Sequence, residues 1–144
     1  MDVDRFTDKH LYKTEVMKHL LFFCLISIVL SACSSPTPDE IASLAARGYY
    51  EHLMRGEYDE FLEGKAGADS LPDAYREQLL VCYKQFMSQQ MSMHQGINEI
   101  RIINARRDSL LTYTNVFLML CFDDSTNEQV SVPMIEHNGN WKMK

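Results

Sequence analysis

Apolar and polar residues alternate with two different periods along the chain, and the period changes once, near residue 96. Before that point apolar side chains recur every three or four residues, which is typical of helices with one buried face. After it they recur at every second residue, which is typical of half-buried strands. Helices followed by hairpin-linked strands predict an α+β fold, in which N-terminal helices pack on a four-stranded antiparallel sheet.

The helical half is predicted to hold three helices. The first starts with the capping box Thr37-Pro38-Asp39-Glu40. A short helix is expected over 57–62, and a long one over about 71–94 with Ser70 as its N-cap. The residues expected to face the core are Ile41, Leu44, Ala45, Tyr49 and Leu53 in the first helix, and Leu79, Cys82, Tyr83, Phe86, Met87 and Met91 in the third.

The other half is predicted to hold four strands, over 97–105, 110–122, 128–136 and 140–144. A turn is expected over 106–109, a hairpin loop over 123–127, and a two-residue hairpin at Asn138-Gly139. The inward face is assigned to Ile100 and Ile102 in the first strand, Val116, Leu118, Leu120 and Phe122 in the second, and Val130, Val132 and Met134 in the third.

The opposite face of the strand over 110–122 is also largely apolar, and it carries Tyr113, Asn115, Phe117, Met119 and Cys121. In a single-layer sheet that face meets solvent, and exposed apolar area of this kind marks interaction sites. Tyr113, Phe117 and Met119 are therefore candidate interface residues for a homodimer or an envelope protein partner. The alternative is a one-residue slip, which would exchange the two faces.

The N-terminal segment has the organisation of an export signal. Lys18 and His19 precede an apolar run over 20–30 that contains one polar residue, Ser27. The run is too short to span about 30 Å of hydrocarbon, which takes roughly 20 residues, but it suits the apolar region of a signal peptide. Residues 1–16 are rich in acidic side chains, so we interpret Met17 as the true start; the alternative is a cytoplasmic extension of an uncleaved anchor.

The residues that follow, Leu30-Ser31-Ala32-Cys33, resemble the lipobox of bacterial lipoproteins. The resemblance implies a signal peptide over 17–32, cleavage between Ala32 and Cys33, and a diacylglycerol on the Cys33 thiol. It makes 33–38 a lipidated tether and 39–144 the folded domain, anchored to a membrane of the bacterial cell envelope. Ser34 after the cysteine favours the outer membrane by analogy. The alternatives are a plain membrane anchor and a secretory signal with an incidental cysteine.

The charge and the cysteine content of the chain limit the kinds of partner and of covalent crosslink to be expected. The 144-residue chain carries a formal net charge of −6 and has no basic block, so nucleic acid is not an expected partner. Processing would leave Cys82 and Cys121, which either form a disulfide in an oxidising compartment or stay as buried free thiols.

Two short motifs give a second resemblance. The run 55–61, Arg-Gly-Glu-Tyr-Asp-Glu-Phe, and the run 139–143, Gly-Asn-Trp-Lys-Met, are similar to motifs of small lipoproteins of the nuclear transport factor 2-like (cystatin-like) superfamily. The resemblance implies a curved sheet that wraps the helices into a cone with a pocket. Candidate pocket residues are Tyr49, Leu53, Tyr83, Phe86, Met87 and Trp141.

Enzymes of that superfamily place an aspartate, histidine or tyrosine inside the cone, whereas the inward strand faces of this chain are apolar. The sequence therefore predicts a ligand-binding or protein-interaction module; the alternatives are an isomerase or dehydratase using the pocket and a structural accessory subunit. No catalytic residue, metal site or cofactor is expected. His52, His94 and His137 are dispersed. The acidic run over 57–63 lacks the spacing of a calcium loop and is interpreted as a solvated helix face.

Overall fold

The computed structural model describes residue 13 and residues 16–20, 35–108 and 110–144. The predicted cleavage site at Ala32 and the predicted lipidation site at Cys33 lie outside the described residues. The folded domain is the compact unit 36–144. Within the described part, no helix combines the length and the apolarity needed to cross a bilayer.

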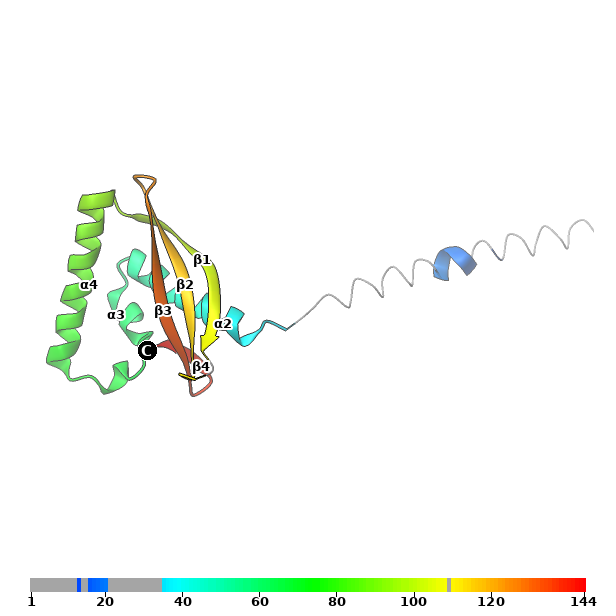
Figure 1. Cartoon of the computed structure of the whole chain (residues 1–144), viewed down its shortest axis with the longest axis horizontal. Helices are drawn as coiled ribbons and strands as arrows, with labels where there is room; N and C mark the ends of the chain where they lie inside the picture. The colour runs from blue at the N-terminus through cyan, green and yellow to red at the C-terminus, as the bar shows by residue number, and fades with distance from the viewer. Residues whose placement is uncertain (1–12, 14–15, 21–34, 109) are drawn as a thin grey trace, which may run out of the picture. The chain divides into compact units, whose positions relative to one another are not determined.

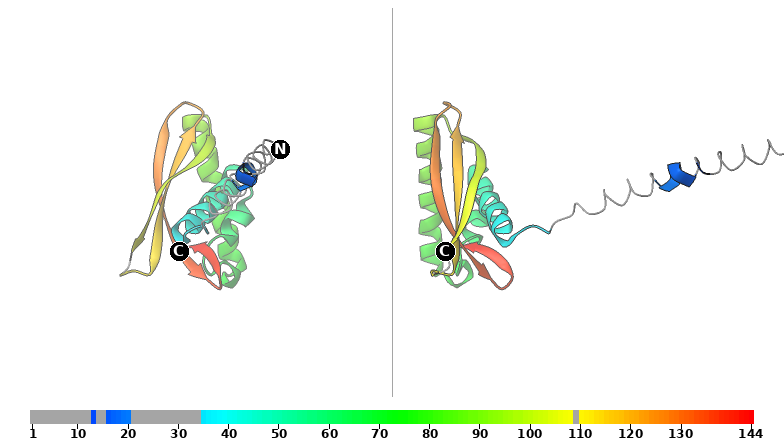
Figure 2. Two further views of the ribbon diagram at one scale, coloured as in Figure 1. Left: turned by 90° about the vertical axis from the view of Figure 1, so that its right-hand side faces the viewer. Right: turned by 45° about the vertical axis from the view of Figure 1, so that its right-hand side comes forward.

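The folded domain has four helical elements and four strands, in the order expected. The helical elements are α2 (Pro38–Met54), α3 (Tyr58–Glu63), the 3₁₀ turn η1 (Ala68–Ser70) and α4 (Asp73–His94). The strands are β1 (Ile97–Asp108), β2 (Tyr113–Phe122), β3 (Asn127–His137) and β4 (Asn140–Met143). They form one antiparallel sheet in the order β1-β2-β3-β4, with the helices on one side of it (Figures 1 and 2). The α+β prediction is confirmed.

Helix α2 begins as predicted, and its buried face agrees with the prediction in part: Leu53 is buried, and Ala45 and Tyr49 pack against the core. The Thr37 side chain accepts a hydrogen bond from the Glu40 amide, and the Glu40 carboxylate accepts one from the Thr37 amide. The buried side chains include Ala42 and Ala46, whereas the predicted core residues Ile41 and Leu44 are exposed. Alanine allows a helix to lie close to a sheet, so the small-residue face is the one that packs against the strands.

Helix α4 begins two residues later than predicted and is less buried. Ser70 belongs to η1, and Pro72 is the N-cap of α4. Tyr83, Phe86 and Met87 pack against the core, but two other members of the predicted stripe, Cys82 and Met91, are exposed. Only Gln90 is buried in this helix. The prediction was wrong at Cys82 and Met91. The surface of α4 that packs against the domain is narrower than the band of apolar residues along the helix.

Strand β1 is longer than predicted, so the expected turn over 106–109 is shifted. Residues 106–108 still pair with β2. The carboxylate of Asp108 accepts hydrogen bonds from the amides of Leu110 and Leu111, and Thr112 has a φ of 55°. An aspartate that bonds amides two and three residues ahead closes a turn locally. The chain therefore reverses between Asp108 and Tyr113, and β2 starts at Tyr113 rather than at Leu110.

The faces of β2 follow the predicted alternation. Val116, Leu118, Leu120 and Phe122 are buried. Cys121, expected on the solvent side, is buried as well and is a free thiol. Its register partner is Glu99, which forms an ion pair with Arg101 on the same face of β1; we attribute the burial of this small side chain to these longer neighbours. The Asn138-Gly139 hairpin is confirmed, with φ values of 51° and 77° that suit a type I′ turn.

The C-terminal strand is joined to the helices through Gly64. The Met143 amide donates to the Gly64 carbonyl at 2.8 Å, and the Ala66 amide donates to the Met143 carbonyl at 2.7 Å. The Tyr49 hydroxyl donates to the Trp141 carbonyl at 2.9 Å. Segments from both ends of the domain therefore meet at one place, and Trp141 lies in the core beside them.

Candidate functional site

The six predicted pocket residues lie in or against one hydrophobic cluster. Leu53 and Trp141 are buried members of it, and the others are partly buried and pack on it. They come from α2, α4 and β4, so elements distant in sequence converge in this cluster. The partly buried members are Tyr49, Tyr83, Phe86 and Met87.

Aromatic rings link the helices within this cluster. The Phe61 ring lies between Tyr50 and Tyr83, with ring centroids 5.5 Å and 4.9 Å away and edge-to-face geometry. Burial raises the pKa of the Tyr50 hydroxyl, and the neighbouring Tyr83 raises it further. Burial likewise raises the pKa of Tyr83. Both phenols therefore stay protonated at neutral pH and form part of an apolar wall.

Three open hollows lie at other places on the domain. A polar one of about 260 Å³ lies between the 63–69 segment and the β3–β4 hairpin, and its lining includes Lys65, His137 and Lys142. A second, of about 550 Å³, lies on the exposed side of α4 and includes Val81 and Cys82. A third, of about 200 Å³, lies on the outer face of the sheet. None of the three is lined by the six predicted pocket residues.

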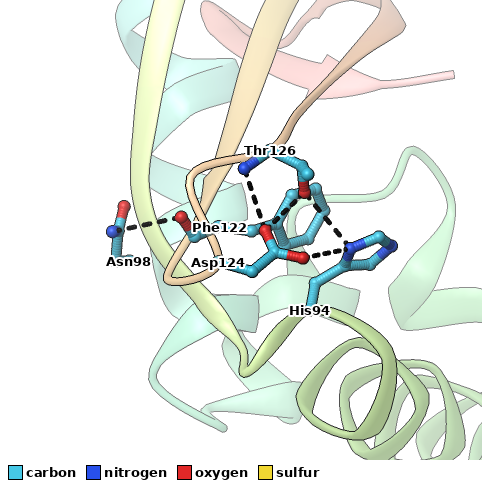
Figure 3. A network of polar contacts seen from close by, with 5 residues as sticks. All are labelled: His94, Asn98, Phe122, Asp124 and Thr126. Atoms are coloured by element: carbon cyan, nitrogen blue, oxygen red, sulfur yellow. Dashed lines mark hydrogen bonds and ion pairs between the residues drawn. The ribbon is translucent and has the colours of Figure 1, made fainter.

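A polar network joins the C-terminus of α4 to the loop between β2 and β3 (Figure 3). The Thr126 hydroxyl donates to Asp124 Oδ1 at 2.5 Å, and the Thr126 amide donates to the same oxygen at 2.9 Å. His94 Nδ1 lies 2.9 Å from Asp124 Oδ2. The Thr126 contacts and, to a smaller extent, His94 lower the pKa of Asp124 to about 2. The carboxylate is therefore ionised at neutral pH.

The same residue types build nucleophilic triads, but the geometry here differs. In a triad the carboxylate and the hydroxyl bind opposite nitrogens of the imidazole. Here Thr126 Oγ1 and Asp124 Oδ2 both approach Nδ1 of His94, at 3.2 Å and 2.9 Å. The Thr126 hydroxyl has one proton, which it donates to the Asp124 carboxylate. The His94 imidazole is therefore not placed to act as a base toward this hydroxyl. The network therefore has a structural role: it holds the end of α4 against the β2–β3 loop, and we call His94, Asp124 and Thr126 the clasp. The Asp124 amide reinforces the clasp by donating a hydrogen bond to the His94 carbonyl.

Three of the acidic side chains over 57–63 form ion pairs with neighbouring basic side chains. Arg76 Nη2 contacts Glu63 at 2.6 Å and Asp59 at 3.4 Å, which links α4 to α3. Glu57 contacts Arg55 at 2.8 Å and His52 at 2.6 Å. Arg55 first, and then His52, lower the pKa of Glu57. Among the described residues, no group of three metal-binding side chains comes together.

Comparison with solved structures identifies the fold. The chain is similar to a candidate NTF2-like transpeptidase from Campylobacter jejuni, with a TM-score of 0.53 and 12% sequence identity. The match covers 68% of this chain and 92% of that one. The fold is NTF2-like. A likeness at this identity concerns the fold alone. No family model matches the sequence, and no curated protein matches it.

The candidate interface of the NTF2-like domain lies on the outer face of its sheet. Tyr113, Phe117 and Met119 are half-buried there. Phe117 lines the outer hollow together with Ile103 and Arg106. The structure holds a single copy of the chain, so the interface stays a prediction.

Sequence reasoning missed two features of the NTF2-like domain. The Asp124–Thr126 contact has a local signal, since an aspartate two residues before a threonine favours a side-chain turn. The contact of His94 with this turn spans 30 residues, and no pattern in the sequence indicates it. The hydrogen bond between Tyr49 and Trp141, 92 residues apart, likewise has no signal in the sequence.

Proposed function

We propose that this NTF2-like protein is a lipid-anchored module of the bacterial cell envelope that binds a ligand or a partner protein. The observation that carries the proposal is the sequence Leu30-Ser31-Ala32-Cys33, which ends three residues before the compact unit that starts at Pro36. That spacing suits a lipoprotein, in which an acylated cysteine is followed by a short tether and a folded domain. Ser34 favours the outer membrane.

The inner face of the sheet supports binding rather than proton transfer. The described core cluster consists of apolar and aromatic side chains. The buried polar group on β2 is Thr114, whose hydroxyl donates to Asp39 at 3.2 Å. Isomerases and dehydratases need a base close to the reacting carbon. The buried apolar wall instead forms a rigid core that supports recognition at the surface of the domain.

Lipidation is tested by substitution of the modified residue. Cys33→Ala should abolish incorporation of labelled fatty acid and leave the precursor uncleaved, because the thiol that receives the lipid is gone. Cys24→Ala is the matched control, since it removes a cysteine from the same apolar segment and leaves Cys33 in place. Fatty acid on the Cys33→Ala protein would refute the anchoring proposal.

Partner binding is tested by crosslinking of the lipidated protein in cells, followed by purification and mass spectrometry. The wild-type protein should capture a specific envelope protein or a second copy of itself. Phe117→Glu with Met119→Lys should reduce that capture if the outer face is the contact surface. Capture that is unchanged in a folded double variant would place the contact elsewhere on the domain.

A further inference from the structure

The turn between β1 and β2 exposes two adjacent leucines. The exposed fraction is 90% for Leu110 and 53% for Leu111. Turns favour glycine, proline, asparagine, aspartate and serine, because these residues fit turn conformations or bond to the turn backbone. A lone exposed leucine is ordinary on a protein surface, whereas two in succession at a turn form a small apolar projection. We call Leu110 and Leu111 the leucine tip.

The backbone of the leucine tip is held by hydrogen bonds. Asp108 Oδ1 accepts from the Leu110 amide at 2.9 Å and from the Leu111 amide at 3.0 Å. Thr112 follows in the left-handed region, with a φ of 55°. The two leucines are therefore presented by a closed turn, although burial in the domain gives them little stabilisation.

Cationic side chains flank the leucine tip. Arg106 and Arg107 are exposed at the end of β1, and neither forms an ion pair with an acidic side chain in the described part of the chain. Lys144 Nζ lies 4.9 Å from the centroid of the Tyr113 ring, at the start of β2. The carboxylate of Asp108 is engaged within the turn. The tip thus combines apolar, aromatic and cationic groups in a protein whose net charge is −6.

The first turn of α2 lies at the same end of the domain. The Thr114 hydroxyl, on β2, donates to Asp39 Oδ1 at 3.2 Å, and Figure 1 shows the β1–β2 turn and the start of α2 toward that end. The acidic groups of this first turn are engaged, Asp39 by Thr114 and Glu40 by the capping box. Cys33 precedes Pro36 by three residues, which is at most about 11 Å of extended chain. An acylated Cys33 would hold this end of the domain close to the bilayer.

We infer that the leucine tip is a second membrane contact. Leu110 and Leu111 enter the headgroup region, and Arg106 and Arg107 pair with the phosphates of anionic phospholipids. Interfacial segments combine apolar side chains with flanking cations in this way. The inference rests on the proposed anchoring at Cys33. Two contacts at one end of the domain fix its orientation, so that the β2–β3 loop at the other end points away from the membrane.

The test places a photoreactive benzophenone side chain at position 110 or 111 of the full chain in cells. The matched control position is Val81 on α4, whose exposed fraction of 51% is close to that of Leu111. After irradiation, phospholipid adducts and protein adducts are identified by mass spectrometry. The yield of phospholipid adduct at 110 should exceed that at 81 about tenfold, since burying a large apolar side chain in an apolar phase shifts its partition by at least that order.

The outcomes separate the inference from the anchoring proposal, because acylation of Cys33 is measured in the same samples. Lipid adducts at 110 and 111 but not at 81 support the leucine tip as a membrane contact. Protein adducts at 110 would overturn the inference and make the tip a protein-docking site. With Cys33 acylated, equal yields at 110 and 81 would also overturn it. An unacylated Cys33 refutes the anchor alone, and the adducts still decide the role of the tip.

The proposed pairing of Arg106 and Arg107 with anionic phospholipids is tested with purified lipidated protein in vesicles. The adduct yield at 110 should be higher with phosphatidylglycerol in the vesicles than with phosphatidylcholine alone. Arg106→Gln with Arg107→Gln should remove that difference while leaving the melting temperature unchanged, because both side chains are exposed. A lipid preference that survives the double substitution would overturn the assignment of the two arginines.

Discussion

Gly64→Ala should destabilise the domain although it adds only one methyl group. An ideal Cβ at this position would lie less than 3.0 Å from three atoms of the Tyr49 ring. Gly64 has φ and ψ of −67° and −14°, which suit alanine, so the backbone contributes no strain. The Tyr49 hydroxyl is bonded to the Trp141 carbonyl, and the ring cannot move without loosening β4.

The magnitude follows from three contributions. Overpacking of a core typically costs about 1–3 kcal/mol, and loss of the hydrogen bond between Tyr49 and Trp141 adds about 1 kcal/mol. Alanine has less conformational freedom than glycine in the unfolded chain, and this difference stabilises the folded state by about 0.4–1 kcal/mol. The net decrease in the free energy of unfolding is about 2 kcal/mol. For a domain near 100 residues that lowers the melting temperature by roughly 8 °C.

Urea and thermal unfolding of the 36–144 domain, followed by circular dichroism, measure this change. Gly48→Ala is the matched control, because Gly48 lies inside α2 with nothing within 4 Å of its ideal Cβ; this substitution should stabilise by about 0.5–1 kcal/mol. In a Tyr49→Ala background the cost of Gly64→Ala should disappear. The steric argument would be refuted if the Gly64→Ala variant were as stable as the wild type. It would also be refuted if Gly64→Ala lowered the free energy of unfolding equally in the wild-type and Tyr49→Ala backgrounds.

Three further predictions concern the core, the clasp and the outer face. Trp141→Ala should lower the free energy of unfolding by about 3–5 kcal/mol, and an unchanged melting temperature would place Trp141 at the surface. Asp124 has a pKa lowered from 3.8 to about 2; its contribution is present above about pH 4 and lost as the pH falls through 2, so Asp124→Asn should flatten that part of the stability profile, as thermal melts would show. Ultracentrifugation should find residues 34–144 self-associating at micromolar concentration, and Phe117→Glu with Met119→Lys should give a folded monomer; a monomeric wild type together with an unfolded double variant would refute the interface.

The features that sequence predicts well are determined within a few residues. The capping box at Thr37 and the hairpin at Asn138-Gly139 each depend on neighbours along the chain, and both are present. Alternation along β2 is also local, because successive side chains of a strand point to opposite faces. These patterns were enough to predict the α+β order and the inward face of the central strand.

Features that depend on tertiary packing were missed or misplaced. Apolar periodicity in α4 predicted Met91 as a core residue, but a periodic pattern does not say how much of a helix its neighbours cover. Leu110 was assigned to a strand because it is apolar, although the preceding Asp108 carries a turn signal. The need for glycine at position 64 depends on the Tyr49 ring, 15 residues earlier in the numbering, and cannot be recognised without the fold.

The attachment of β4 to α2 has a consequence for biosynthesis. The hydrogen bond between Tyr49 and Trp141 joins residues 92 positions apart, and among the helices and strands of the domain α2 is synthesised before the others and β4 after them. Long-range contacts of this kind make folding slow, because much of the chain must be ordered before they form. If the chain is exported as we propose, the domain would therefore reach its final packing only after β4 had left the secretion channel. A C-terminal truncation that removes 141–144 should yield a chain that is exported but remains open to proteolysis.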